Sequence, residues 1–202
     1  MDCFALLNEP RRPWLDPDSL KRKFLARSAE THPDRVHNGS ESEKRAAQQR
    51  YLDLNGAYNC LREPKERLQH LLELELGAKP QQVQDIPPDL MDLFMGVGQL
   101  CRDTDAFLAE KSTVTSALLQ VGIFERGQEW TEKLVTLQQQ IAGRQEAALS
   151  ELKALDAAWD CTGGPGAARQ VALKRLEELY RLFSFYGRWS AQIQERIVRL
   201  AL

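Results

Sequence analysis

Two long apolar stripes in the C-terminal half constrain the fold of this chain more than any other feature. The residues of each stripe recur at three-to-four-residue spacing, which places them on one face of an α-helix. The first stripe consists of Leu134, Leu137, Ile141, Ala148, Leu152, Leu155 and Trp159. The second consists of Val171, Leu176, Leu179, Phe183, Tyr186, Ile193, Ile197 and Leu200. Residues 161–166 contain Gly-Gly-Pro and are expected to break the helix, so that the second helix returns antiparallel to the first.

A segment rich in proline and glycine precedes this pair of helices. Residues 77–88 combine these residue types with several glutamines, which is typical of a linker. Apolar periodicity resumes at Leu90, on a helix introduced by Pro88 that would complete an antiparallel bundle. Residues 111–127 fit neither a long helix nor a clear strand and are left unassigned. The sequence therefore predicts an all-α chain of three parts, with an N-terminal domain at 1–76, a linker at 77–88 and a helical bundle at 89–202.

Composition narrows the classes of function. With 202 residues, 43% of them hydrophobic, the chain is large enough for packed cores. No apolar run approaches the length that spans a bilayer, and residues 1–15 lack the core of a signal peptide, so we expect a cytoplasmic protein without a membrane partner. A formal net charge of −2 argues against a broad nucleic-acid surface.

The four cysteines give no sign of a metal site or of a disulfide framework. They are Cys3, Cys60, Cys101 and Cys161, widely spaced and without a C-x-x-C pair. This pattern predicts packing thiols in a reducing compartment.

Two helices with clear start signals are predicted in the N-terminal third. Asp16 can cap a helix that has Pro17 at its first position and runs to about Thr31. Ser40 and Glu43 fit a capping box, in which each side chain satisfies a backbone N–H at the start of a helix that reaches about residue 61.

The polar loop between these helices contains His32-Pro33-Asp34. Pro33 disfavours a helical conformation at His32, so the first helix should end there and leave His32 and Asp34 at an exposed corner. Its flanking residues distinguish this tripeptide from a chance occurrence. They are a short apolar helix at residues 2–7, Phe24 eight residues before His32, and the run from Leu54 to Pro64.

With these flanks, the first third of the chain resembles a J domain, the module that stimulates ATP hydrolysis by DnaK-type heat-shock chaperones. The whole chain is most similar to HscB-type J proteins, the co-chaperones of iron-sulfur cluster assembly. In that family the J domain passes through an Arg-rich turn and a Leu-Leu-x-Leu segment into a helical C-terminal domain, much as Arg67–Gly77 does here.

The resemblance implies that the corner binds the chaperone rather than catalysing a reaction. Asp34 would pair with an arginine of the chaperone through a charge-assisted hydrogen bond. Pro33 would fix the loop, and His32 would supply a polar aromatic contact. Basic side chains would steer the encounter with an acidic chaperone surface, or would simply form a solvated charged face. These basic residues are Lys21, Arg22, Lys23, Arg27 and Arg35.

The same resemblance implies a client site on the helix after Pro88. An IscU-type iron-sulfur scaffold protein would be the client, and the candidate anchors are Leu90, Met91, Phe94 and Met95. The apolar anchors match the family, whereas Met95, Val97 and Gly98 stand where HscB-type proteins carry charged residues. These apolar residues could instead belong to the core of the bundle.

An enzyme is the alternative from another class. His32, Asp34 and His37 form H-x-D-x-x-H, which offers three metal ligands for a metal-dependent hydrolase. The sequence contains neither a phosphate-binding loop nor a nucleophile motif. We therefore predict a co-chaperone without catalytic residues, metal or cofactor. A J protein that serves another client, or acts as a static tether, remains the nearer alternative.

Overall fold

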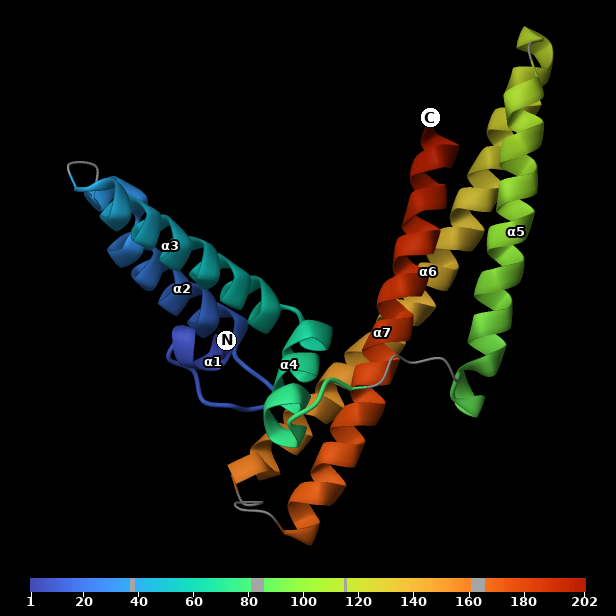
Figure 1. The fold of residues 1–202 in the computed structure, drawn as a ribbon. Helices are drawn as coiled ribbons and strands as arrows, with labels where there is room; N and C mark the ends of the chain where they lie inside the picture. Colours follow the sequence, from blue (N-terminus) through green and yellow to red (C-terminus); the bar gives the residue numbers. More distant parts are fainter. Residues whose placement is uncertain (37–38, 81–85, 115, 161–165) are drawn as a thin grey trace. The chain divides into compact units, whose positions relative to one another are not determined.

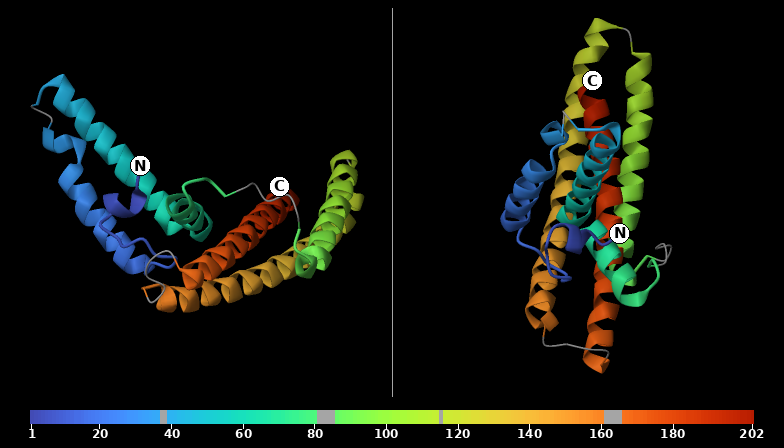
Figure 2. Two further views of the ribbon diagram at one scale, coloured as in Figure 1. Left: turned by 60° about the horizontal axis from the view of Figure 1, so that its bottom comes forward. Right: turned by 60° about the vertical axis from the view of Figure 1, so that its left-hand side comes forward.

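The computed structural model describes residues 1–36, 39–80, 86–114, 116–160 and 166–202. All regular elements in these ranges are helical (Figure 1 and Figure 2), which confirms the predicted all-α fold. Within the same ranges, no helix combines the length and the apolar character that crossing a membrane requires. The helices form two compact units, unit 1 with Met1–Gln81 and Ser150–Tyr180, and unit 2 with Gln82–Leu149 and Arg181–Leu202.

Unit 1 contains the N-terminal helices. In chain order these are α1 (Cys3–Leu6), α2 (Pro17–Thr31), the 3-10 helix η1 (Pro33–Val36), α3 (Glu41–Arg62) and α4 (Pro64–Leu76). Figure 1 shows α2 and α3 side by side as a helical hairpin. The ring of Phe24 on α2 stacks on that of Tyr58 on α3, with centroids 4.2 Å apart. The buried apolar side chains of this hairpin and its neighbours include Phe4, Leu7, Leu20, Leu54, Leu61, Leu68, Leu71 and Leu72.

The predicted caps of the two hairpin helices are confirmed. The Asp16 carboxylate accepts a hydrogen bond from the Ser19 backbone N–H at 2.8 Å. At the start of α3, the Ser40 N–H donates to the Glu43 carboxylate at 2.7 Å, and the Glu43 N–H donates to the Ser40 hydroxyl at 3.3 Å. These bonds satisfy N–H groups that have no partner inside the helix, so the caps fix where each helix begins.

One arginine is buried at the junction of α3 and α4. The Arg67 guanidinium donates to the Leu61 carbonyl at 2.6 Å and to the Pro13 carbonyl at 2.8 Å. Burial lowers the pKa of Arg67 to about 10, so the side chain is still charged at neutral pH. It therefore ties the segment before α2 to the turn between α3 and α4.

Replacing Arg67 with Met is expected to lower the free energy of unfolding by about 2–3 kcal/mol, because it leaves two carbonyl groups without their donor. Urea unfolding followed by circular dichroism measures the loss. Arg62→Met is the matched control, since the Arg62 side chain is 53% exposed, pairs with the neighbouring Glu63 and lies over the Tyr58 ring at 5.8 Å. An exposed pair of this kind contributes about 0–1 kcal/mol. Equal effects of the two substitutions would contradict the role given to Arg67.

The C-terminal end of α6 (Ala117–Trp159) and the N-terminal part of α7 (Ala167–Ala201) also belong to unit 1. The buried Asp156 carboxylate pairs with Arg12 at 2.9 Å and accepts the Trp14 backbone N–H at 3.1 Å. Arg169 pairs with Glu75 of α4 at 2.9 Å. These units are each built from two separate stretches of the chain. The predicted domains at 1–76 and 89–202, with a linker at 77–88, concern independent folding and stay a prediction.

Unit 2 contains the short 3-10 helix η2 (Pro88–Leu90), α5 (Met91–Thr113) and the remaining parts of α6 and α7. Figure 2 shows α5 beside α6 and α7. Buried side chains from all three helices form its core, among them Val97, Phe107, Leu134, Ile141, Phe185, Tyr186, Trp189 and Ile193. At its edge, Arg196 of α7 pairs with Asp105 of α5 at 2.5 Å.

Most residues of the two apolar stripes are buried as predicted. The prediction is wrong at the start of the second stripe, where it chose the wrong face of the helix. Val171 is 68% exposed, and Leu173 is buried in its place at the start of α7. The predicted break at residues 161–166 lies outside the described residues except for Gly166, and it is flanked by the end of α6 and the start of α7. The unassigned segment 111–127 contains the end of α5 and the beginning of α6, joined by residues 114–116, of which the structure does not describe Thr115.

Candidate functional site

The His-Pro-Asp corner is the turn that joins α2 to α3. Helix α2 ends at Thr31, whose hydroxyl donates to the Arg27 carbonyl at 2.9 Å. His32 then adopts φ −59° and ψ 132°, the extended conformation that a following proline favours. The 3-10 helix η1 brings Asp34 to the surface with 89% of its side chain exposed. The corner therefore presents a carboxylate that a partner can reach.

The ring of His32 is held against α3. The Asp34 backbone N–H donates to His32 Nδ1 at 3.3 Å, and the same nitrogen lies 3.4 Å from the Asp34 carboxylate. The ring meets Tyr51 of α3 edge to face, with centroids 5.4 Å apart. Sequence analysis did not identify Tyr51, because its contact with His32 joins two helices and leaves no local pattern. The contact orients the imidazole on the exposed turn.

Gly39 sits between the turn and the capping box of α3. A Cβ atom there would lie 2.9 Å from the Glu43 carboxylate and 3.1 Å from the Val36 carbonyl. Gly39→Ala should therefore displace the cap and lower the free energy of unfolding by about 1 kcal/mol. The control is Gly56→Ala on α3, where a Cβ would meet nothing within 4 Å. It should raise the free energy of unfolding by about 0.5–1 kcal/mol, because alanine favours a helix more than glycine does. Thermal or urea unfolding measures both, and equal signs would contradict the steric argument.

Lys23, one of the predicted chaperone-binding residues, also has a structural role. Its ammonium group pairs with Glu9 at 2.9 Å and donates to the Asn8 carbonyl at 3.3 Å. Asn8 has a positive φ of 53°, a conformation that asparagine tolerates better than most residues. Lys23 thus fixes the loop that follows α1.

The other basic candidates differ in what the structure shows. Lys21 and Arg22 are exposed on α2, and Arg27 is half-buried nearer its end. The side chains of Pro33 and Arg35 lie outside the described part of the structure, although both residues belong to η1. The exposed positive charge before the corner thus comes from Lys21 and Arg22, and their role in steering remains a prediction.

The candidate client residues in unit 2 divide between core and surface. Leu90, at the end of η2, is only 1% exposed and belongs to the core. Met91, Phe94 and Met95 on α5 are 42%, 38% and 58% exposed. Phe94 also contacts Trp189 of α7, with ring centroids 6.4 Å apart. A partner approaching from solvent would therefore meet these three side chains, which we call the α5 patch, and not Leu90.

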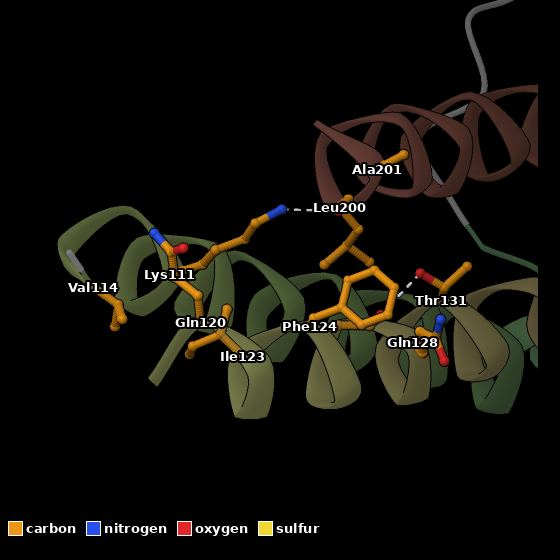
Figure 3. A pocket seen from close by; sticks show the side chains of 10 residues that line it. Lys111, Val114, Gln120, Ile123, Phe124, Gln128, Thr131, Leu200 and Ala201 are labelled. Carbon is orange, nitrogen blue, oxygen red and sulfur yellow. Dashed lines mark hydrogen bonds between the residues drawn. The ribbon is translucent and has the colours of Figure 1, made fainter. Parts of the chain in front are cut away.

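Unit 2 also contains a cavity of about 350 Å³ near the C-terminal end of α7. Figure 3 shows Lys111 reaching toward Leu200, whose carbonyl accepts its hydrogen bond at 2.9 Å. The lining is otherwise apolar or uncharged and consists of Val114, Gln120, Ile123, Phe124, Gly127, Gln128, Thr131, Leu200 and Ala201. Apart from Lys111, whose ammonium group is held by the Leu200 carbonyl, the lining offers shape and apolar surface but no group suited to acid–base chemistry.

The metal-dependent hydrolase gains no geometric support at the corner. His37 lies outside the described residues, so its distance from His32 and Asp34 is not part of the structure. In the described part of the chain, the one group of three potential ligands lies elsewhere and consists of Cys3, Cys60 and His70.

The structure describes three of the four cysteines that were predicted to be packing thiols. Cys3 and Cys101 are buried and Cys60 is half-buried, and all three are free thiols, whereas Cys161 lies outside the described residues. The grouping of Cys3 with Cys60 and His70 was missed by sequence analysis, which treated the cysteines as isolated packing residues.

Comparison with known proteins bears on the fold. No protein-family model matches the sequence. Among solved structures, the chaperone HscB from Vibrio cholerae matches with a TM-score of 0.61 and 19% identity over 96% of each chain. The human co-chaperone protein HscB matches with a TM-score of 0.58 and 16% identity, over 98% of this chain and 81% of that one. The chain therefore has the HscB fold along nearly its whole length.

Proposed function

We propose that this chain with the HscB fold is a J-type co-chaperone, which stimulates ATP hydrolysis by a DnaK-type chaperone and brings a client to it. The observation that carries the proposal is the His32-Pro33-Asp34 turn at the end of the α2–α3 hairpin, where His32 and Asp34 are exposed. Exposure, caps on both helices and a defined imidazole orientation suit a preformed recognition surface. The role requires no catalytic group in this chain.

The geometry supports a division of labour at the corner. The exposed Asp34 carboxylate can accept charge-assisted hydrogen bonds from an arginine of the chaperone. Lys21 and Arg22 add exposed positive charge on the preceding helix, which would speed the encounter with an acidic surface. His32 presents an imidazole held by Tyr51.

The client that we propose is an IscU-type iron-sulfur scaffold protein, bound in the cytoplasm through the α5 patch. Met91 and Met95 have flexible, polarizable side chains that adapt to a partner surface, and Phe94 supplies a larger apolar contact. One observation favours a client other than an iron-sulfur scaffold protein. At the positions where HscB-type proteins carry charged residues, this chain has Met95, Val97 and Gly98, and Val97 is buried.

A single-turnover ATPase assay tests the co-chaperone role directly. The full chain is added to a DnaK-type chaperone loaded with ATP, and the rate of hydrolysis is compared with that of the chaperone alone. Stimulation that rises to saturation with co-chaperone concentration is the expected result. Metal-dependent hydrolysis by the chain alone, without any effect on the chaperone, would favour the enzyme instead.

A further inference from the structure

Three potential metal ligands from three helices meet inside unit 1. Cys3 is the first residue of α1, Cys60 lies near the end of α3, and His70 lies on α4. Their two Sγ atoms and an imidazole nitrogen all lie within 4.8 Å of one another. This cluster lies apart from the His-Pro-Asp turn, and the proposed function makes no use of it.

The surrounding contacts hold the three side chains in place. His70 Nε2 accepts a hydrogen bond from the Cys3 backbone N–H at 3.0 Å, and the imidazole stacks on the Phe4 ring at 5.8 Å between centroids. Cys60 Sγ lies 3.7 Å from the Glu66 carbonyl, to which its thiol can donate. Cys3 is buried, whereas Cys60 and His70 are half-buried. An ion could therefore enter from the side of Cys60 and His70.

We propose that Cys3, Cys60 and His70 bind a thiophilic divalent cation, with Zn²⁺ the ion that best suits two thiolates and one imidazole. Zinc binds thiolates at about 2.3 Å and imidazole nitrogen at about 2.0–2.1 Å in tetrahedral geometry. Its ligand atoms are then about 3.5–4 Å apart, so the cluster needs to contract only by about 1 Å. Three protein ligands leave the fourth position for water.

The protonation states of the cluster are compatible with this proposal. The contact between the two thiols lowers the pKa of Cys3, whereas the same contact and burial raise the pKa of Cys60, so the Cys60 thiol loses its proton only when a cation binds. Burial lowers the pKa of His70, so its ring is neutral at neutral pH, the form that coordinates metals. On binding, each thiol releases its proton to solvent. If the ion binds Nε2, it replaces the hydrogen bond from the Cys3 N–H.

A bound ion would hold the short helix α1 in place. Helix α1 has only 4 residues and depends on its surroundings for stability. Coordination through Cys3 would link α1 to α3 and α4 directly, and binding to the folded state alone would stabilise the unit by linkage.

Zinc binding by the full chain tests the proposal. Metal-free protein in a thiol-free reductant is titrated with Zn²⁺ against a chromophoric chelator, and with Co²⁺ to detect the thiolate-to-metal charge-transfer band. We expect one Zn²⁺ per chain, a thiolate band with Co²⁺, and a higher melting temperature with zinc. Cys60→Ala and His70→Gln should each weaken binding more than about 100-fold, since even residues that only support metal ligands contribute about 10–100-fold.

Cys101→Ala is the matched control, because Cys101 is a buried thiol in unit 2. It should leave zinc affinity unchanged. Circular dichroism checks that Cys60→Ala and His70→Gln are folded, and these half-buried positions are chosen over the buried Cys3 for that reason. The proposal is overturned if the wild-type chain binds no zinc, if Co²⁺ gives no thiolate band, or if folded Cys60→Ala and His70→Gln retain wild-type affinity.

Discussion

Asp34→Asn is expected to abolish stimulation of a DnaK-type chaperone while leaving the fold of the co-chaperone intact. The Asp34 side chain is 89% exposed, so its substitution disturbs no packed core. A hydrogen bond to a charged group contributes about 1.5–3 kcal/mol, which corresponds to a loss of about 10–100-fold in affinity. A transient complex weakened by this factor would not form at ordinary assay concentrations.

The measurement is single-turnover ATP hydrolysis by the chaperone, with circular dichroism of the variant in parallel. Glu30→Gln is the matched control, since it removes one exposed carboxylate from the nearby end of α2. It should retain stimulation. Equal losses in the two variants would indicate a general effect of charge, and loss of helical content in Asp34→Asn would indicate a structural role instead.

His32→Gln should also reduce stimulation, for a different reason. The substitution keeps a polar side chain but removes the ring that packs on Tyr51. If Tyr51 orients the imidazole, Tyr51→Leu should lower stimulation as well, although Tyr51 is not part of the tripeptide. Full activity of Tyr51→Leu would show that its contact with His32 is only structural.

Local signals explain why the helical hairpin could be predicted from the sequence. The Ser40–Glu43 capping box involves residues three apart, and the end of α2 follows from Pro33 acting on its neighbour. Such signals are complete within one turn of helix. The fold class and the position of the corner could therefore be predicted from the sequence. The structure confirms the caps and the all-α fold class.

Contacts between segments that are distant in the sequence could not be predicted from such local signals. Cys3 and His70 are brought together only when α1 packs against α4, and no spacing rule connects them. The pairing of Arg12 with Asp156 likewise depends on the C-terminal end of α6 packing in unit 1. Periodicity also failed where a stripe has two possible phases, as at Val171 and Leu173.

Leu90 and Met91 show the same limit at the proposed client site. Both are apolar neighbours at the start of one helical segment, yet Leu90 is 1% exposed and Met91 is 42% exposed. The sequence places them together, whereas η2 ends and α5 begins between them. A test of client binding must therefore spare Leu90, whose truncation in a packed core would cost about 2–5 kcal/mol.

Replacing Met91, Phe94 and Met95 together with Ala should weaken capture of an IscU-type scaffold by at least about 100-fold. Full burial of one such side chain in an interface contributes about 1.5–3 kcal/mol, and each 1.4 kcal/mol corresponds to a factor of ten in affinity. Basal stimulation of the chaperone should be nearly unchanged, because these residues belong to unit 2 and the corner belongs to unit 1. Calorimetry or surface plasmon resonance with the purified scaffold measures the loss of affinity.

The control must remove as much exposed apolar surface from the same unit. Leu119, Val121 and Phe124 on α6 are 60%, 62% and 66% exposed, so their joint replacement with Ala matches the α5 variant in number and kind. If the α5 patch binds the scaffold, only the α5 variant loses affinity, and both remain folded in thermal unfolding. Normal scaffold binding by a stable α5 variant would place the client site elsewhere.

If the α6 variant loses binding instead, the interface lies near the Lys111–Leu200 cavity, where Phe124 forms part of the lining. Wild-type chain that stimulates the chaperone but binds no scaffold would favour another client, as the uncharged residues at Met95 and Gly98 suggest.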